Sequence, residues 1–292
     1  MEIKNSQKDL KNTAMLDLSI VGKKFEPTVF EYTWKDVVLY ALGIGAQADE
    51  LPFVYEHTPV GLKVFPSYGV ILSGKSYMDI LAAMKVDFSR FIHGEHRLKL
   101  HGPILPQGKT LTVGEVASIY DKGKAAIITF RMKTTTYEGE PVCDDEAVIF
   151  YRGAGGFGGD PGPKTEPLVP PEGVEPDFRV SYAIPENQAA LYRLNGDLNP
   201  LHIDPGFAKL GGFDRPILHG LCTFGYATRA ILYSLCDGDV GRFKEIKARF
   251  SGVVYPGETL ITEGWKGQDG RYLIQAGTER GVVLNQAYAV VA

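Results

Sequence analysis

A segment rich in glycine and proline divides the chain into two parts. Residues 153–176 contain seven Gly and six Pro among 24 residues. Glycine leaves the backbone unrestrained and proline lacks a backbone donor, so neither a helix nor a strand ladder can persist there. The segment predicts a linker between two domains, residues 1–152 and residues 177–292. Each domain is long enough to bury a hydrophobic core of its own.

The two parts share short sequence matches in the same order. Residues 39–42 (LYAL) match residues 191–194 (LYRL) at an offset of 152. Residues 102–106 (GPILP) match residues 252–256 (GVVYP) at an offset of 150. Matches this short carry little weight singly, but their nearly constant offset predicts two degenerate copies of one unit.

Each part carries a run of antiparallel strand signals. Runs of β-branched and aromatic residues between turn residues predict strands at 111–120, 125–137 and 142–151, and again at 259–265, 272–276 and 282–291. Apolar residues recur every three or four positions over residues 221–235, which predicts a long helix. The pattern favours an α+β fold in which a sheet curls around a buried helix in each half.

Composition excludes several classes of protein. Lys and Arg total 31 against 35 for Asp and Glu, so the net charge of −4 offers no basic surface for nucleic acid. No apolar run approaches the roughly 20 residues that cross a bilayer, so we expect no membrane insertion. Cys143, Cys222 and Cys236 lack a C-x-x-C spacing. They predict free thiols in a reducing compartment rather than disulfides or a zinc site.

Two nucleotide-binding patterns and a histidine cluster have plainer explanations. Residues 69–76 (GVILSGKS) match the P-loop pattern, but their middle is bulky and the downstream strands form a meander. Residues 153–158 match G-x-G-x-x-G, but prolines follow where a helix should begin. His93, His96 and His101 have no acidic or cysteine partner at ligand spacing. We expect these histidines to be solvated or to face substrate, and we expect no metal.

A loop is predicted around the helix breakers Gly196 and Pro200. It carries three polar residues close together, Asp197, Asn199 and His202. An irregular loop can direct three polar side chains to one point. A carboxylate and an imidazole there can polarise a water molecule and take its proton, because imidazole titrates near neutral pH. The amide of Asn199 can orient either partner. The alternative is that Asp197 and His202 only cap the flanking helices.

Gly220 stands at the predicted start of the long helix, just after His219. A backbone N–H at a helix N-terminus has no partner within the helix, and glycine puts no side chain in front of it. Such a group can hold a developing oxyanion, assisted by the helix dipole. A base, an orienting amide and an oxyanion donor together predict the addition or removal of water beside a thioester carbonyl.

The duplication separates the roles of the two parts. The offset of 152 residues places Gly45, Gln47 and Glu50 opposite the positions of the Asp-Asn-His triplet. The first copy therefore lacks both the acid and the histidine. We expect the chemistry in the second part and a substrate-shaping role for the first.

These residues resemble a known family. The segment from Asp197 to Pro205, with residues 216–225 (PILHGLCTFG), is similar to the hydratase 2 signature of MaoC-like (R)-specific enoyl-CoA hydratases, including the hydratase 2 domain of peroxisomal multifunctional enzyme type 2. Residues 93–95 (HGE) and 121–123 (DKG) extend the likeness into the first part. The resemblance implies a double hot-dog fold with a catalytic second unit and a first unit opened to long acyl chains.

The resemblance also implies an activity and a site. The reaction is reversible hydration of trans-2-enoyl-CoA to (3R)-3-hydroxyacyl-CoA in fatty acid β-oxidation, with no cofactor. By position, Asp197 and His202 activate the water, Asn199 supports them and Gly220 donates its amide to the thioester oxygen. The implied acyl-CoA contacts are His93, Gly94, Lys122 and Phe250.

Partners and compartment follow only from the family. It implies a homodimer with an acyl-CoA substrate, and a peroxisomal location. The chain ends at Ala292 without a Ser-Lys-Leu signal, so a cytoplasmic location is the alternative. Two other functions stay open. One is an acyl-CoA thioesterase, in which the water attacks the carbonyl; the other is a non-catalytic acyl-CoA-binding module.

Overall fold

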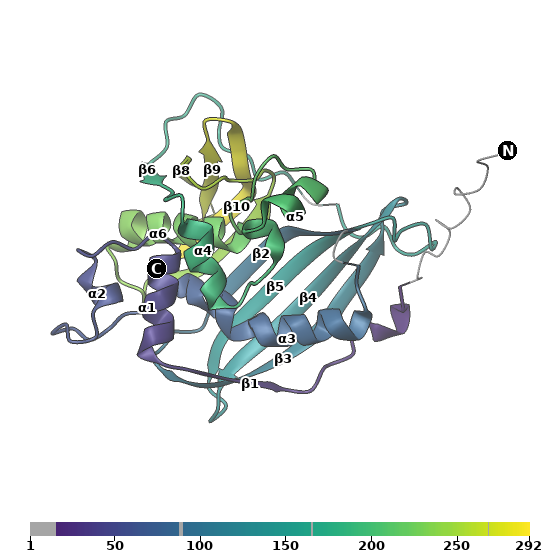
Figure 1. Cartoon of the computed structure of the whole chain (residues 1–292), viewed down its shortest axis with the longest axis horizontal. Helices are drawn as coiled ribbons and strands as arrows, with labels where there is room; N and C mark the ends of the chain where they lie inside the picture. The colour runs from purple at the N-terminus through teal and green to yellow at the C-terminus, as the bar shows by residue number, and fades with distance from the viewer. Residues whose placement is uncertain (1–15, 88–89, 165, 268) are drawn as a thin grey trace.

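Two long helices, α3 (Gly69–Met84) and α6 (Gly220–Cys236), lie against a twisted antiparallel sheet (Figure 1). The computed structural model describes residues 16–87, 90–164, 166–267 and 269–292. Residues 1–15 of the predicted first domain lie outside the described residues. The shorter helices are α1 (Trp34–Gly43), α2 (Leu51–Val54), α4 (Gln188–Tyr192) and α5 (Pro205–Leu210).

The sheet is continuous through both halves of the chain. The first half contributes β1 (Thr28–Tyr32), β2 (Phe91–Leu100), β3 (Gly108–Asp121), β4 (Ala125–Thr136) and β5 (Pro141–Arg152). The second contributes β6 (Phe178–Ala183), β7 (Phe243–Phe250), β8 (Thr259–Lys266), β9 (Tyr272–Thr278) and β10 (Gly281–Val291). The order β1-β3-β4-β5-β2-β7-β10-β9-β8-β6 repeats in reverse about the β2–β7 pair. That symmetry is the one expected of a duplicated unit.

The predicted strands are confirmed with small differences at their ends, and the sheet of each half packs on its own long helix. The sequence did not predict β2 and β7, which pair with each other from Glu95↔Arg249 to Lys99↔Glu245. This pairing joins the two predicted sheets edge to edge. It also brings the start of β2 beside the end of β7, where the functional residues of the two halves meet.

Helix α6 matches the predicted helix over residues 221–235 and is almost wholly buried. Phe224, Ala227 and Ile231 are fully inside the core. The helix begins directly after His219 and ends at Cys236, and its C-cap Asp237 adopts the left-handed conformation. Because burial of apolar surface is the main stabilising contribution to a fold, α6 is a rigid platform for whatever its first turn presents.

The P-loop pattern at residues 69–76 lies inside helix α3. Its amides are therefore used by helical hydrogen bonds and cannot surround a phosphate. Lys75 pairs with Asp79 one turn further on, at 2.9 Å, while Ser73 and Ser76 are buried against the sheet. The match to a nucleotide-binding motif is coincidental.

The first copy of the duplicated loop holds a buried ion pair in place of the Asp-Asn-His triplet. Glu50, opposite His202 in the duplication, accepts hydrogen bonds from Nε of Arg229 at 3.0 Å and from the hydroxyl of Tyr233 at 2.6 Å. Both partners lie on α6. This position therefore ties the first half of the chain to the helix of the second.

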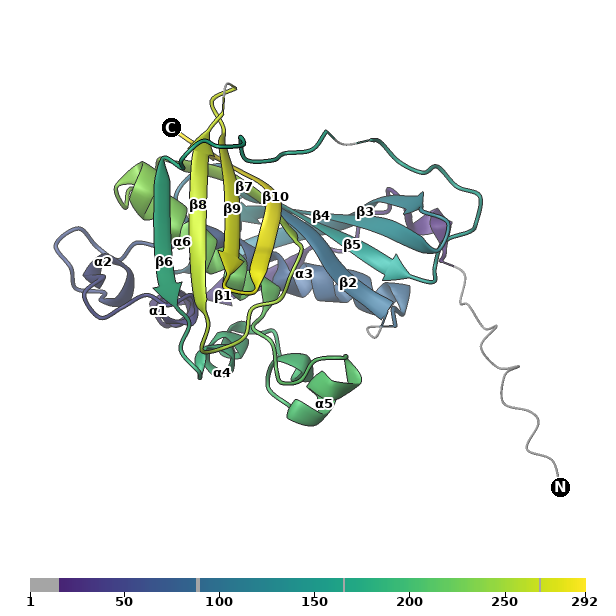
Figure 2. The same ribbon diagram turned by 90° about the horizontal axis from the view of Figure 1, so that it is seen from above.

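The described residues between β5 and β6 form neither helix nor strand and run along the edge of the molecule (Figure 2). The carboxylate of Asp121 accepts the N–H groups of Gly156 and Gly158, each at 2.8 Å. Successive amides of a glycine-rich turn form a concave anion site, and here the chain's own carboxylate fills it. The G-x-G-x-x-G pattern is therefore part of how the linker is held.

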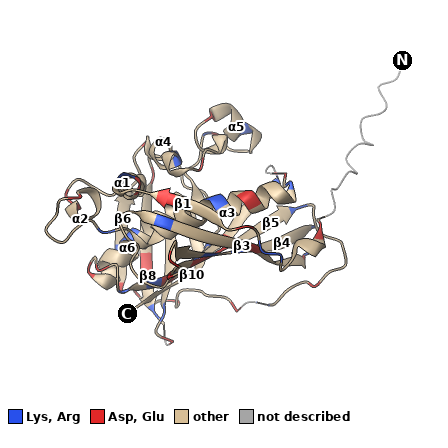
Figure 3. Cartoon of the chain, turned by 90° about the horizontal axis from the view of Figure 1, so that it is seen from below, with Lys and Arg blue, Asp and Glu red and all other residues tan. Residues whose placement is uncertain are grey.

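Positive and negative residues are interspersed on the sheet (Figure 3), and ion pairs join some of them across strands. Lys247 lies 2.8 Å from Glu95, and Arg97 lies 2.7 Å from Glu245. All three cysteines are free thiols, as predicted, and all three are buried. Among the described residues, no helix combines the length and the apolar character that a bilayer crossing requires.

Candidate active site

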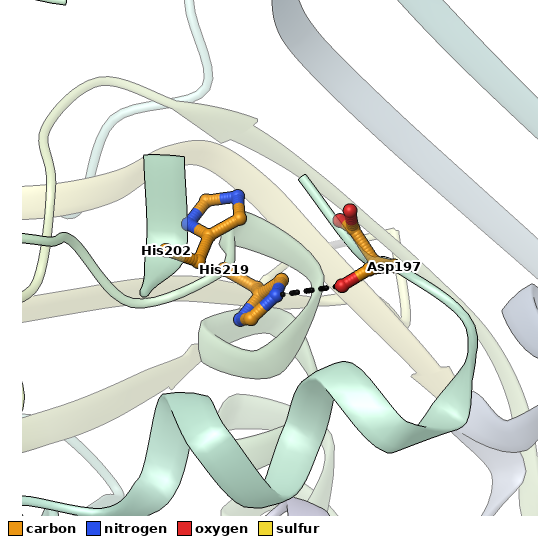
Figure 4. Close-up of side chains that lie close together, drawn as sticks. All are labelled: Asp197, His202 and His219. Carbon is orange, nitrogen blue, oxygen red and sulfur yellow. Dashed lines mark hydrogen bonds between the residues drawn. The ribbon is translucent and has the colours of Figure 1, made fainter. Parts of the chain in front are cut away.

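Asp197, His202 and His219 converge at the start of α6 (Figure 4). One carboxylate oxygen and one ring nitrogen from each histidine lie within 4.8 Å of one another. Asp197 is exposed and both histidines are buried. Asp197 follows the left-handed Gly196, His202 closes the 3-10 turn Pro200–His202, and His219 directly precedes α6. The fold therefore brings together the Asp–His pair that the sequence predicts.

The imidazole of His202 has a defined tautomer. Its Nδ1 lies 2.9 Å from the carbonyl oxygen of Ile217. A carbonyl oxygen can only accept, so Nδ1 carries the hydrogen and Nε2 keeps its lone pair. Burial lowers the pKa of His202, although the nearby Asp197 carboxylate and the Ile217 carbonyl act against that shift. At neutral pH, His202 is a neutral base with a free nitrogen.

His219 is a site residue that sequence reasoning missed. Its Nε2 donates to the backbone oxygen of Asp197 at 3.2 Å, and its ring stacks on His202 with centroids 3.8 Å apart. Burial, with a further contribution from His202, lowers the pKa of His219 to about 3. The neutral ring therefore holds the Asp197 loop against α6. The available signal was its place immediately before the predicted helix start.

The geometry of the three side chains favours proton transfer over metal coordination. The rings of His202 and His219 stack with an interplanar angle of 29°. The lone pairs of nearly parallel rings lie in the ring planes and do not converge on one point, as tetrahedral coordination requires. One nitrogen of each ring is also occupied by a hydrogen bond to a backbone carbonyl.

The helix caps of this loop are Asn199 and Asp204, and not Asp197 or His202. The side chain of Asn199 caps the turn Pro200–His202, while its backbone N–H donates to Asp197 at 3.2 Å. Helix α5 is capped by Asp204. The interpretation of Asp197 and His202 as helix caps is therefore wrong. Asn199 supports Asp197 through its backbone rather than through its side chain.

The first turn of α6 leaves the amide of Gly220 free. Among the described residues this N–H has no acceptor, whereas the N–H groups of Cys222 and Thr223 bond to the carbonyl of His219. A side chain here would place its Cβ 3.3 Å from the ring of Phe250. The ring of Phe250 therefore forms a wall beside an unpaired amide at the positive end of a long buried helix.

The residues expected to touch acyl-CoA are only partly brought together. The ring of His93 lies edge-on to Phe250, with centroids 5.0 Å apart. Gly94 sits at a register shift in the β2–β5 pairing. Lys122 lies in the β3–β4 turn and binds the backbone oxygen of Pro161 in the linker. Phe250 thus lies beside Gly220 with His93 against its ring, and Lys122 is engaged elsewhere.

The expectation that the His93–His101 cluster is solvated or faces substrate is wrong for His96. His96 is buried and its Nε2 lies 2.9 Å from a carboxylate oxygen of Asp145. His101 lies 3.1 Å from Asp144 at the surface. The acidic partners come from β5, which is distant in sequence but paired with β2. No spacing rule within one segment could have found them.

A cavity of about 200 Å³ has His202 in its lining. Glu186, Ala190, Arg215 and Pro216 contribute to its lining. It gives water a place next to the imidazole of His202.

Acidification is expected to destabilise the fold through its buried histidines. Burial lowers the pKa of both His93 and His219 to about 3, from an unfolded value near 6.5. Between pH 6.5 and about pH 3 these histidines are protonated in the unfolded chain but not in the folded one. The free energy of unfolding therefore decreases as the pH is lowered through this range. Each histidine costs about 1.4 kcal/mol per pH unit in that window. Urea unfolding between pH 7 and pH 5 measures the slope.

The slope separates buried from exposed histidines. His219→Asn should reduce the dependence of the unfolding free energy on pH, whatever it does to stability at pH 7. His57→Gln is the matched control, because the side chain of His57 is 73% exposed. Equal slopes in all three proteins would contradict the prediction.

Comparisons with known proteins cover both halves. Residues 30–153 match the family model described as "MFE-2 hydratase 2 N-terminal domain", and residues 168–286 match "MaoC like domain". A probable enoyl-CoA hydratase 2 from Dictyostelium discoideum is 40% identical over 93% of this chain and 95% of its own length. The peroxisomal multifunctional enzyme type 2 of Mus musculus is 41% identical over 92% of this chain, which spans 37% of that enzyme.

Solved structures agree with the fold. A MaoC-like dehydratase from Phytophthora capsici superposes with a TM-score of 0.86 at 33% identity, over 95% of this chain and 97% of the other. A Mycobacterium tuberculosis protein described as having a double hotdog fold superposes with a TM-score of 0.56 at 16% identity, over 92% and 97% of the two chains. The second likeness concerns the fold alone, and the predicted double hot-dog architecture is confirmed.

Proposed function

Since the chain belongs to the MaoC-like hydratase 2 family of hydro-lyases, we propose that it hydrates trans-2-enoyl-CoA to (3R)-3-hydroxyacyl-CoA, reversibly, in fatty acid β-oxidation. The observation that carries the proposal is the convergence of Asp197 and His202 beside the unpaired amide of Gly220. The relatives supply the substrate class, because named members are enoyl-CoA hydratases.

The first step is activation of a water molecule. The water lies between the Asp197 carboxylate and the free Nε2 of His202. As its oxygen adds to the β-carbon of the enoyl group, His202 takes one of its protons. The backbone N–H of Asn199 donates to the Asp197 carboxylate and His219 donates to the backbone oxygen of Asp197, so the carboxylate needs little rearrangement.

The thioester oxygen gains negative charge when the water adds. The free N–H of Gly220, at the positive end of α6, stabilises that charge. The protonated Asp197–His202 pair then returns the proton to the α-carbon. The net change is one hydroxyl on the β-carbon and one hydrogen on the α-carbon, and the enzyme returns to its starting state.

The first half of the chain shapes the acyl-CoA site. His93 and Phe250 line the side next to Gly220, with Gly94 beside them, while Lys122 lies in the turn between β3 and β4. The positions opposite the catalytic triplet hold an ion pair to α6 instead. We further propose a homodimer, and a peroxisomal location on the strength of relatives named as peroxisomal.

One assay distinguishes the three functions. Purified protein is given crotonyl-CoA and trans-2-decenoyl-CoA, and loss of the enoyl absorbance is followed together with chiral analysis of the product. Hydration to the (3R) alcohol is the expected result. Release of free CoA thiol from a saturated acyl-CoA would indicate a thioesterase instead. Tight binding of acyl-CoA with no turnover would indicate a binding module.

A further inference from the structure

A buried chain of polar side chains leads from the core of the first half to the wall of the candidate site. The hydroxyl of Ser73 on α3 donates to Asp145 on β5. The other oxygen of Asp145 lies 2.9 Å from Nε2 of His96 on β2, and Nδ1 of His96 lies 3.2 Å from Nε2 of His93. Ser73, Asp145 and His96 are each at most 3% exposed.

The contact with Asp145 indicates which ring nitrogen of His96 carries the hydrogen. His96 Nε2 and the Asp145 oxygen lie 2.9 Å apart without hydrogen-bond geometry, so their contact is electrostatic, and it favours a hydrogen over a lone pair on that nitrogen. The opposite nitrogen of the same ring then faces His93. The charge of Asp145 thus favours one orientation of the His96 ring, and the hydrogen bond of His96 to His93 passes that preference on.

The other end of the chain reaches the reaction site. His93 lies edge-on to Phe250, whose ring borders the position of Gly220. Tyr77 on α3 lies beside His93, with ring centroids 6.4 Å apart. Burial raises the pKa of Tyr77, and the charges of Asp145 and Asp197 add to that shift, so Tyr77 stays neutral beside His93.

A role in core packing alone does not explain why a carboxylate (Asp145) and an imidazole (His96) are buried here. Burying a carboxylate and an imidazole costs desolvation energy, and apolar side chains of similar volume usually serve a core equally well. A pair of this kind is useful where one ring must be held in one orientation and one tautomer.

We propose that His96 and Asp145 are positioning residues for the wall of the acyl-CoA site that His93 and Phe250 form. They fix the ring and the tautomer of His93, and the edge contact of His93 then positions the ring of Phe250 beside Gly220. The half of the molecule that lacks the catalytic triplet thereby sets part of the substrate geometry. This inference rests on the proposed function, because the wall is that of the acyl-CoA site.

The kinetic test compares an apolar replacement with a conservative one. His96→Phe/Asp145→Leu removes the polar chain without leaving a buried charge, and His96→Leu/Asp145→Leu repeats the test should the first variant misfold. We expect KM for decenoyl-CoA to rise about tenfold, equivalent to about 1.4 kcal/mol, with kcat little changed. His96→Gln can still donate to Asp145 and accept from His93, so it should restore KM to near the wild-type value.

A second readout does not depend on turnover. In ¹⁵N-histidine NMR spectra of the ligand-free protein, His93 should show one tautomer in wild type and in His96→Gln, and a mixture in the apolar variants. His101→Phe/Asp144→Leu, a surface pair at the same strands, is the control and should change neither KM nor the His93 signals.

The two readouts separate the possible failures. Wild-type protein that does not hydrate enoyl-CoA would defeat the proposed function, while the NMR comparison would still test the positioning of His93. Unchanged His93 signals in a folded apolar variant would overturn the inference. Altered signals with an unchanged KM would also overturn it, because the wall would then not depend on His93.

Discussion

Asp197→Asn is expected to lower kcat for enoyl-CoA hydration by about 10²–10⁴-fold while the protein stays folded. The amide keeps an oxygen that can accept the N–H of Asn199, and the backbone oxygen that binds His219 is untouched. What the amide lacks is the negative charge that polarises the water and shares its proton with His202. The loss should therefore appear in kcat, with KM for acyl-CoA close to the wild-type value.

Asp204→Asn is the matched control for this substitution. Asp204 lies on the same loop and caps α5 by accepting the N–H of Phe207 at 2.9 Å. Asparagine caps a helix about as well as aspartate, so this variant should keep its activity and its stability. A loss of only a few-fold for Asp197→Asn would refute the assigned role. An equal loss in both variants would indicate damage to the loop rather than to the chemistry.

The elements that the sequence predicted well are those whose signals are local. Helix α6 has an apolar stripe, and β3 to β5 and β8 to β10 are β-branched runs separated by turn residues. Helix α3 was missed because it starts at a glycine without a side-chain cap and shares residues 69–76 with a nucleotide-binding pattern. Its buried and exposed positions become distinct only once the sheet is in place.

Strands β2 and β7 were missed because their residues look like a charged surface. Two ion pairs cross the β2–β7 pairing, Arg97 with Glu245 and Lys247 with Glu95. Each of these charges is unfavourable in a central strand without its partner, and the partner lies far away in sequence. Pairing between segments this far apart in sequence depends on the tertiary fold. The same limit hid the contact between His96 and Asp145.

The residues of the candidate site also differ in whether a local sequence signal reveals them. The sequence could predict Asp197 and His202 because a short loop between helix breakers carries both, and Gly220 because a helix begins there. It could not predict His219, whose part depends on a hydrogen bond to the Asp197 backbone and on stacking with His202. Both contacts form only when the loop folds back onto α6.

Gly220→Pro is expected to lower kcat by about 10²–10³-fold, the usual effect of losing one oxyanion donor. Proline is favoured at the first position of a helix, where the missing N–H has no partner within the helix. His219 has φ −58° and ψ 135°, the extended conformation that a residue before proline prefers. The substitution therefore removes the donor with little demand on the backbone of α6.

Gly220→Ala distinguishes the loss of the N–H donor from the steric effect of the added Cβ. Both substitutions add a Cβ at the position 3.3 Å from the Phe250 ring, but alanine keeps the N–H. Alanine should therefore mainly raise KM, by pressing on the ring, and proline should in addition lose kcat. Thermal melts of both variants check that α6 still forms. If the two variants lose kcat equally, the amide of Gly220 does not hold the oxyanion, and its glycine serves only to make room for Phe250.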